Sequence, residues 1–102
     1  MSSATDQRQK VDLRKVREGM YVAHHGGLYL VVATRGEERV LLGDGGRPMR
    51  SQTGAHGNLA TVCKSVLVED CQGEHTDEEG VYPLIWIERA TFEQFEFVGW
   101  SS

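Results

Sequence analysis

Six side chains of the kinds that bind metal ions are spread through the middle of the chain: His24, His25, His56, Cys63, Cys71 and His75. Structural zinc sites usually have four nitrogen or sulfur ligands, which occur as closely spaced pairs. Cys71 and His75 have the spacing of half a site, and His56 and Cys63 would have to complete it. The sequence has no CxxC, HxxxH or HExxH motif. We therefore expect neither a metal centre nor a cofactor.

The two cysteines are also candidates for a nucleophile. A reactive thiolate needs cationic neighbours or a helix N-terminus to lower its pKa. Cys71 instead follows Glu69 and Asp70, whose negative charges raise a thiol pKa. Cys63 precedes Lys64, but neighbouring residues of a strand point to opposite faces. The residue types thus favour two free thiols and no catalytic group.

The histidine pair His24-His25 comes directly before Gly26-Gly27. Two glycines suit a two-residue hairpin turn, so both histidines should end a strand. Strand alternation then sends them to opposite faces, and a single chain should not bring both to one ion. We expect one histidine to face solvent and the other to lie at the mouth of the fold or at a subunit seam.

A glycine-rich stretch, GDGGRPMRSQTGAHGN, covers residues 43–58. Its length favours a binding loop or a mobile lid. It lacks the lysine of a phosphate-binding P-loop, and Asp44-Gly45 is typical of a hairpin turn. Its arginines are candidates for holding an anion. The predicted ligand-binding residues are His24, His25, Arg47, Arg50 and His56.

Charge is distributed unevenly along the chain. The formal net charge is −4, and residues 69–96 carry nine acidic residues against Arg89 alone. This acidity opposes nucleic-acid binding. Five of the eight aromatic residues lie in the last seventeen positions, where they suit a core and a protein–protein surface. The predicted interface residues are Trp86, Phe95, Phe97 and Trp100, and a basic N-terminus meeting an acidic C-terminal third would suit a homo-oligomer.

Alternating and apolar segments predict a mainly β fold. Expected strands cover residues 20–25, 28–35, 39–42, 59–70 and 81–88, with turns at Gly26-Gly27 and Gly36-Glu37. Pro83 places its strand at a sheet edge or at a strand start. Thr91 and Gln94 form a possible capping box for one helical turn, which a final strand follows. The count predicts a small antiparallel five- or six-stranded barrel or rolled sheet, with 1–10 a flexible tail and 11–102 one domain.

Two segments resemble known small barrels. The stretch VREGMYVAHHGGLYLVVATR, residues 16–35, resembles the opening of SH3-like barrels such as the N-terminal domain of bacterial elongation factor P. The segment VYPLIWIERA, residues 81–90, is similar to the last strand of plasmid-borne type II dihydrofolate reductases. The resemblance implies a compact SH3-like barrel of the kind found on phages and mobile gene cassettes. The tip lysine of the first family and the Val-Gln-Ile-Tyr motif of the second are missing, so neither activity carries over.

These features favour a non-enzymatic binding module that recognises another protein or its own copy. The alternatives are an oligomeric ligand-binding protein or small enzyme with an interface site near the glycine-rich loop, and a weak nucleic-acid binder using the basic first half. The longest apolar stretch, residues 28–33, is too short to span a membrane, and the polar N-terminus is unlike a secretory signal. We expect a cytoplasmic protein with no membrane contact.

Overall fold

The computed structural model describes residues 9–49, 57–72, 76–77, 80–81 and 84–101. The expectations for Arg50, His56 and His75 lie outside these residues. The main element is a five-stranded antiparallel sheet in the order β6-β3-β2-β1-β7. Its strands are β1 (Met20–His24), β2 (Gly27–Leu42), β3 (Asn58–Asp70), β6 (Leu84–Glu88) and β7 (Glu96–Trp100). The smaller elements are η2 (Leu13–Lys15), η3 (Asp44–Gly46), α1 (Arg89–Phe92) and the pair β4 (Thr76–Asp77) and β5 (Gly80–Val81).

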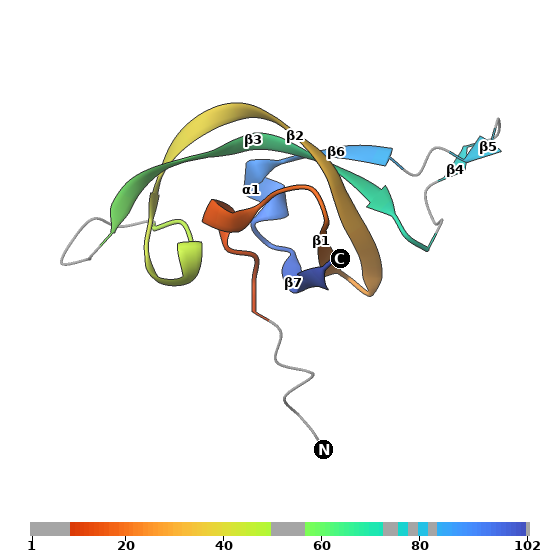
Figure 1. The fold of residues 1–102 in the computed structure, drawn as a ribbon, viewed down its shortest axis with the longest axis horizontal. Coiled ribbons are helices and arrows are strands. Elements are labelled where there is room, and N and C mark those ends of the chain that lie inside the picture. Colours follow the sequence, from red (N-terminus) through yellow and green to blue (C-terminus); the bar gives the residue numbers. More distant parts are fainter. Residues whose placement is uncertain (1–8, 50–56, 73–75, 78–79, 82–83, 102) are drawn as a thin grey trace, which may run out of the picture.

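The sheet is open. The prediction of a mainly β, antiparallel rolled sheet with one short helix is confirmed, but the alternative of a closed barrel is wrong. β6 and β7 form the two edges of the described sheet, and the expectation for Pro83 lies outside the described residues. Closure depends on the tilt and stagger of the first and last strands, which strand patterns do not encode. Figure 1 shows β2 and β3 as an arch over the rest of the molecule.

The arch depends on two unusually long strands. The turn predicted at Gly36-Glu37 is wrong, because β2 continues through Gly36 with a φ of +77°. A Cβ at Gly36 would lie 2.9 Å from the Cβ of Lys64 on β3, so glycine lets the two backbones approach there. The register also shifts between Val31 and Ala33, which makes Val32 an extra residue. Such a bulge increases the bend and twist of a strand.

The first hairpin turn lies one residue earlier than predicted. His24 pairs with Gly27, so the two turn residues are His25 and Gly26. Their φ angles are +49° and +83°, both positive as a type I′ turn requires. His25 therefore occupies a position that histidine tolerates better than a β-branched residue does.

The core lies on the concave side of the arch. Figure 1 shows α1, η2 and β7 beneath β2 and β3. Phe92 of α1 and Val66 of β3 are fully buried there. The fully or nearly fully buried cluster is Val11, Leu13, Met20, Val22, Val31, Leu42, Val62, Val66, Val68, Phe92 and Phe95.

The C-terminal segment forms a helical turn and then a strand, as predicted. The capping box is wrong, because α1 begins at Arg89 with Glu88 as its N-cap, and Gln94 bonds back to the Thr91 carbonyl. At the other terminus, Gln9 and Lys10, which we expected in the flexible tail, contact β7. The Gln9 carbonyl accepts from the Phe97 amide at 2.8 Å, and Lys10 bridges to Glu96.

Candidate functional site

The histidine pair lies at the end of the first hairpin. The two rings are close, with centroids 4.0 Å apart, so the expectation that they point to opposite faces is wrong. The turn conformation of His25 ends the strand alternation and causes this difference. His24 stacks on Phe95 at 4.3 Å with nearly parallel rings. Burial, and then the nearby charges of His25 and Lys10, hold the pKa of His24 below its usual value.

A pocket of about 330 Å³ borders the two histidines. Leu28, Gln72 and Glu96 also line it, but Arg47 does not. Arg47 donates instead to the carbonyls of Val11 at 3.2 Å and Glu93 at 2.7 Å. Its guanidinium thus joins the loop after β2 to the N-terminal segment and to the end of α1. Of the ligand-binding set, the described structure brings only the two histidines together.

The cysteines lie in environments that suppress reactivity. Burial raises the pKa of the half-buried Cys63 thiol. Partial burial and the charges of Glu69 and Asp70 raise the pKa of Cys71. Both thiols are free. Within the described residues, no group of three or more His, Cys, Asp or Glu side chains has the arrangement of a metal site.

The four predicted interface aromatics are divided among three places. Phe95 is 3% exposed and belongs to the core. Phe97 and Trp100 lie together on the concave side, with centroids 5.5 Å apart. Trp86 lies on edge strand β6 and is 41% exposed. The sequence pattern could not distinguish these positions, because each follows from the pairing of β6 and β7 with different strands.

The strand register gathers apolar residues on the convex side of the arch. Directly paired residues share a face of the sheet. One row joins Leu84, Glu69, Leu30 and Tyr21, and the next joins Trp86, Leu67 and Ala33. A third row joins Glu88, Ser65 and Arg35. We call these ten residues the outer face: Tyr21, Leu30, Ala33, Arg35, Ser65, Leu67, Glu69, Leu84, Trp86 and Glu88.

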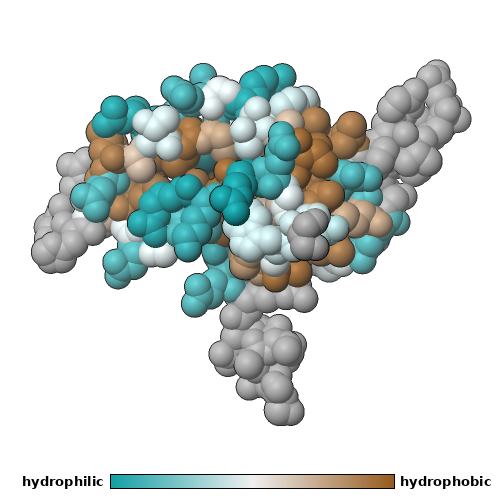
Figure 2. Space-filling view, viewed as in Figure 1, coloured by the Kyte–Doolittle hydropathy of each residue, from teal (hydrophilic) through white to brown (hydrophobic). Residues whose placement is uncertain are grey.

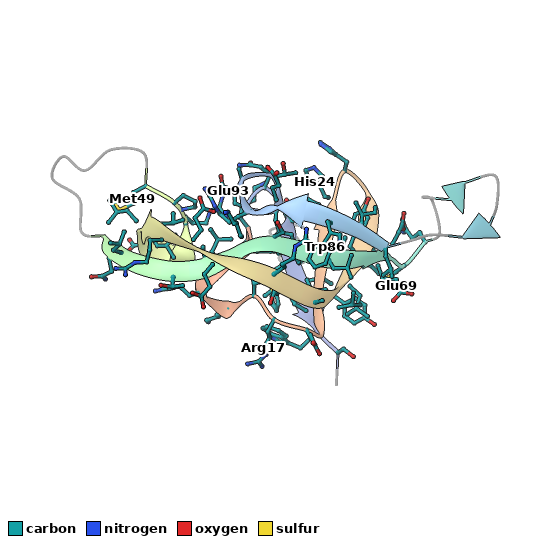
Figure 3. The ribbon with its side chains drawn as sticks, turned by 90° about the horizontal axis from the view of Figure 1, so that it is seen from above. Arg17, His24, Met49, Glu69, Trp86 and Glu93 are labelled. Carbon is teal, nitrogen blue, oxygen red and sulfur yellow. The ribbon has the colours of Figure 1, made fainter. Side chains whose placement is uncertain are left out.

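The outer face is open to solvent over β6. Leu84 is 52% exposed and Trp86 is 41% exposed. Figure 2 shows apolar side chains reaching the surface in the region of β6. In the view from above in Figure 3, Trp86 lies over β6 and β3, and no described helix or strand covers it. Leu30, Leu67 and Tyr21 are half-buried by their neighbours in the sheet.

Arg35 orders the exposed indole. Its guanidinium lies 3.9 Å from the centroid of the Trp86 ring, which is cation–π geometry. The contact restrains the orientation of this large flat side chain. A preordered aromatic loses less conformational entropy on binding than a free one.

Arg89 is a structural residue that the sequence pattern missed. It is the lone base of the acidic C-terminal third, and it donates to both Glu38 oxygens at 3.1 Å and to Glu93 at 3.0 Å. Its hydrogen bonds hold the pKa of Glu38 below its usual value. The contact links the start of α1 to β2, and its only sequence signal is the solitary positive charge.

Comparisons of the chain with protein-family models, with curated proteins and with solved structures found no match. They lend no support to the resemblance to SH3-like barrels. None of the described helices has the length and apolar character needed to cross a membrane. The case for a function therefore depends on the geometry of this chain alone.

Proposed function

We propose that the protein is a non-catalytic binding module that associates with a second copy of itself through the outer face. The observation that carries the proposal is the exposure of Leu84 and Trp86 in register with the half-buried Leu67 and Leu30. A contiguous apolar patch on a sheet face is a feature of association surfaces. Trp and Tyr at such positions supply much of the energy of a typical interface.

Charge complementarity favours a second copy as the occupant. The outer face carries Glu69 in one outer row and Arg35 together with Glu88 in the other, with the Trp86 row between them. Consider a twofold axis along that middle row, which sets two outer faces against each other. The row of Arg35 then meets the partner's row of Glu69. Arg35 of each copy thus comes to the same side of the axis as Glu69 of the other, and the apolar middle row packs against itself.

The chemistry of the thiols supports a role without catalysis. Both cysteines have raised pKa values, so few thiolates form near neutral pH. Two free thiols in a small protein also suit a reducing compartment such as the cytoplasm.

The test is the mass of the protein in solution as a function of concentration, measured by light scattering and sedimentation. The variant Leu84→Glu places a charge in the proposed interface at a side chain that is already 52% exposed. Leu59→Glu is the matched control, because Leu59 is 57% exposed and lies eight residues from Leu67, about 26 Å along β3. We expect a dimer for the natural chain and for Leu59→Glu, and a monomer for Leu84→Glu.

A natural chain that stays monomeric up to the highest soluble concentration would overturn self-association. So would a dimer that Leu84→Glu leaves unchanged, because the interface would then lie elsewhere. Circular dichroism melts of both variants separate lost association from lost folding.

A further inference from the structure

A second candidate binding site lies on the concave side of the sheet, away from the outer face. It is a pocket of about 370 Å³ between the N-terminal segment, η2, η3, the start of β1 and β7. This volume lies in the range of small-molecule pockets. Its lining consists of Gln9, Lys10, Asp12, Arg14, Lys15, Met20, Gly45, Phe97 and Trp100.

The pocket is cationic although the chain as a whole is acidic. Three of its side chains are bases, Lys10, Arg14 and Lys15, and its one acid is Asp12. Arg14 neutralises that acid, with its Nε 3.0 Å and its Nη2 2.8 Å from the two Asp12 oxygens. The positive charge of Lys15 is therefore left uncompensated within the lining.

Lys10 is positioned by the backbone. Its Nζ donates to the Gln94 carbonyl at 2.8 Å. Its charge also lowers the pKa of His24, so the ammonium group lies at the end of β7 away from Trp100. Lys15 is the last residue of η2, and it is exposed.

The other wall of the pocket is aromatic. Met20 and Trp100 are paired across β1 and β7, so they share the concave face, and Phe97 lies beside the indole. Arg17 lies over the Trp100 ring, 4.5 Å from its centroid. Figure 3 shows Arg17 at the opposite side of the molecule from His24. A ring that is 41% exposed and ordered by an arginine can stack against a flat ligand.

These features together define a ligand with a flat ring and a negative charge. A phosphoryl group fits the charges better than a carboxylate does. The guanidinium fork that would bind a carboxylate is already occupied by Asp12, whereas lysines bind phosphate as point charges. We infer that this pocket binds a nucleoside phosphate, with the base against Trp100 and the phosphate beside Lys15. This site is separate from the proposed dimer interface.

The experiment is calorimetric titration of the natural chain with adenosine monophosphate, adenosine and inorganic phosphate. Adenosine monophosphate should bind about tenfold more tightly than either part alone, because ring and anion are recognised by different walls. Raising the salt concentration from about 50 mM to about 200 mM should weaken its binding, since the lysines are exposed. Equal affinity for inorganic phosphate and adenosine monophosphate would reduce the site to a nonspecific anion contact and overturn the inference.

Three variants locate the site. Lys15→Gln should weaken adenosine monophosphate binding by about three- to tenfold at low salt, and Trp100→Leu by about tenfold. Arg39→Gln is the matched control, because Arg39 is an exposed cation of β2 outside the pocket. Trp100→Phe, which keeps a ring, should retain part of the affinity even if Trp100→Leu folds poorly. Unchanged affinity in both Lys15→Gln and Trp100→Phe would place binding elsewhere and overturn the inference.

Discussion

Trp86 and Trp100 occupy opposite edges of the same sheet. Each is 41% exposed, and each lies under an arginine, Arg35 in one case and Arg17 in the other. Trp86 is surrounded by aliphatic side chains on a convex surface. Trp100 borders a pocket whose lining includes basic residues. An arginine–tryptophan contact therefore occurs on each of two surfaces that differ in shape and charge.

The difference shows how neighbours decide what an exposed aromatic can recognise. On the outer face, Leu67 and Leu84 extend the apolar area around the indole, and a flat apolar area suits another protein surface. Near Trp100, Lys15 adds charge within a concave site, which suits a small anion. Both tryptophans look alike when only the type of residue and its exposure are considered.

The substitution Gly46→Ala should have the largest effect. It should disturb the pocket and leave the outer face intact. A Cβ at Gly46 would overlap the Asp12 carboxylate, and the φ of +72° adds backbone strain. We expect a loss of about 2–4 kcal/mol in the free energy of unfolding, measured by urea denaturation. Adenosine monophosphate binding should fall with it, because Asp12 and Arg14 form the pocket wall.

Gly26→Ala is the control for that variant. Its φ of +83° imposes similar strain, but nothing lies within 4 Å of the added Cβ. Its cost should be only about 1 kcal/mol. Equal losses in the two variants would mean that the contact with Asp12 is unimportant.

The next largest expected effect is that one variant loses self-association and another loses adenosine monophosphate binding. Leu84→Glu should weaken self-association by about tenfold or more while adenosine monophosphate binds normally. Lys15→Gln should do the reverse. The measurements are light scattering and calorimetry on the same samples. If either variant impairs both activities, the two surfaces are not independent.

The two arginine–tryptophan contacts give a smaller effect. Arg35→Gln and Arg17→Gln each remove a guanidinium from an indole, and each should cost about 0.5–1 kcal/mol in thermal or chemical unfolding. Arg35→Gln should weaken association, and Arg17→Gln should weaken nucleotide binding. A variant with wild-type stability and binding would show that its arginine does not order the indole.

The smallest expected effect is a pH dependence at His24. Because the pKa of His24 is lowered on folding, the unfolded chain takes up a proton first as pH falls below about 6.5. Stability should therefore decline from that pH down to the folded pKa. His24→Phe keeps a ring against Phe95 and should flatten this decline, as measured by unfolding at a series of pH values.

Local patterns were sufficient to predict the approximate positions of the strands, but they divided β2 in two and displaced the first hairpin turn by one residue. Alternation in residues 59–70 predicted β3, and Gly26 marked the first hairpin to within one residue. Gly36 was misinterpreted, because a glycine that ends a strand and one that lets a strand bend against Lys64 look the same in sequence. Local patterns also placed Trp86, Phe95 and Trp100 in one interface, although they lie in three different environments.

The sequence by itself determined the chemistry that is available: apolar alternation for a sheet, free thiols among acids, and aromatic residues near the C-terminus. Only the tertiary structure decided which of these residues lie next to each other. The pairing of β3 with β6 created the outer face, and the packing of the N-terminal segment on β7 completed the pocket beside Trp100. The physical reason is that binding surfaces combine residues far apart in the chain. Their meeting depends on long-range register and curvature, which no local pattern specifies.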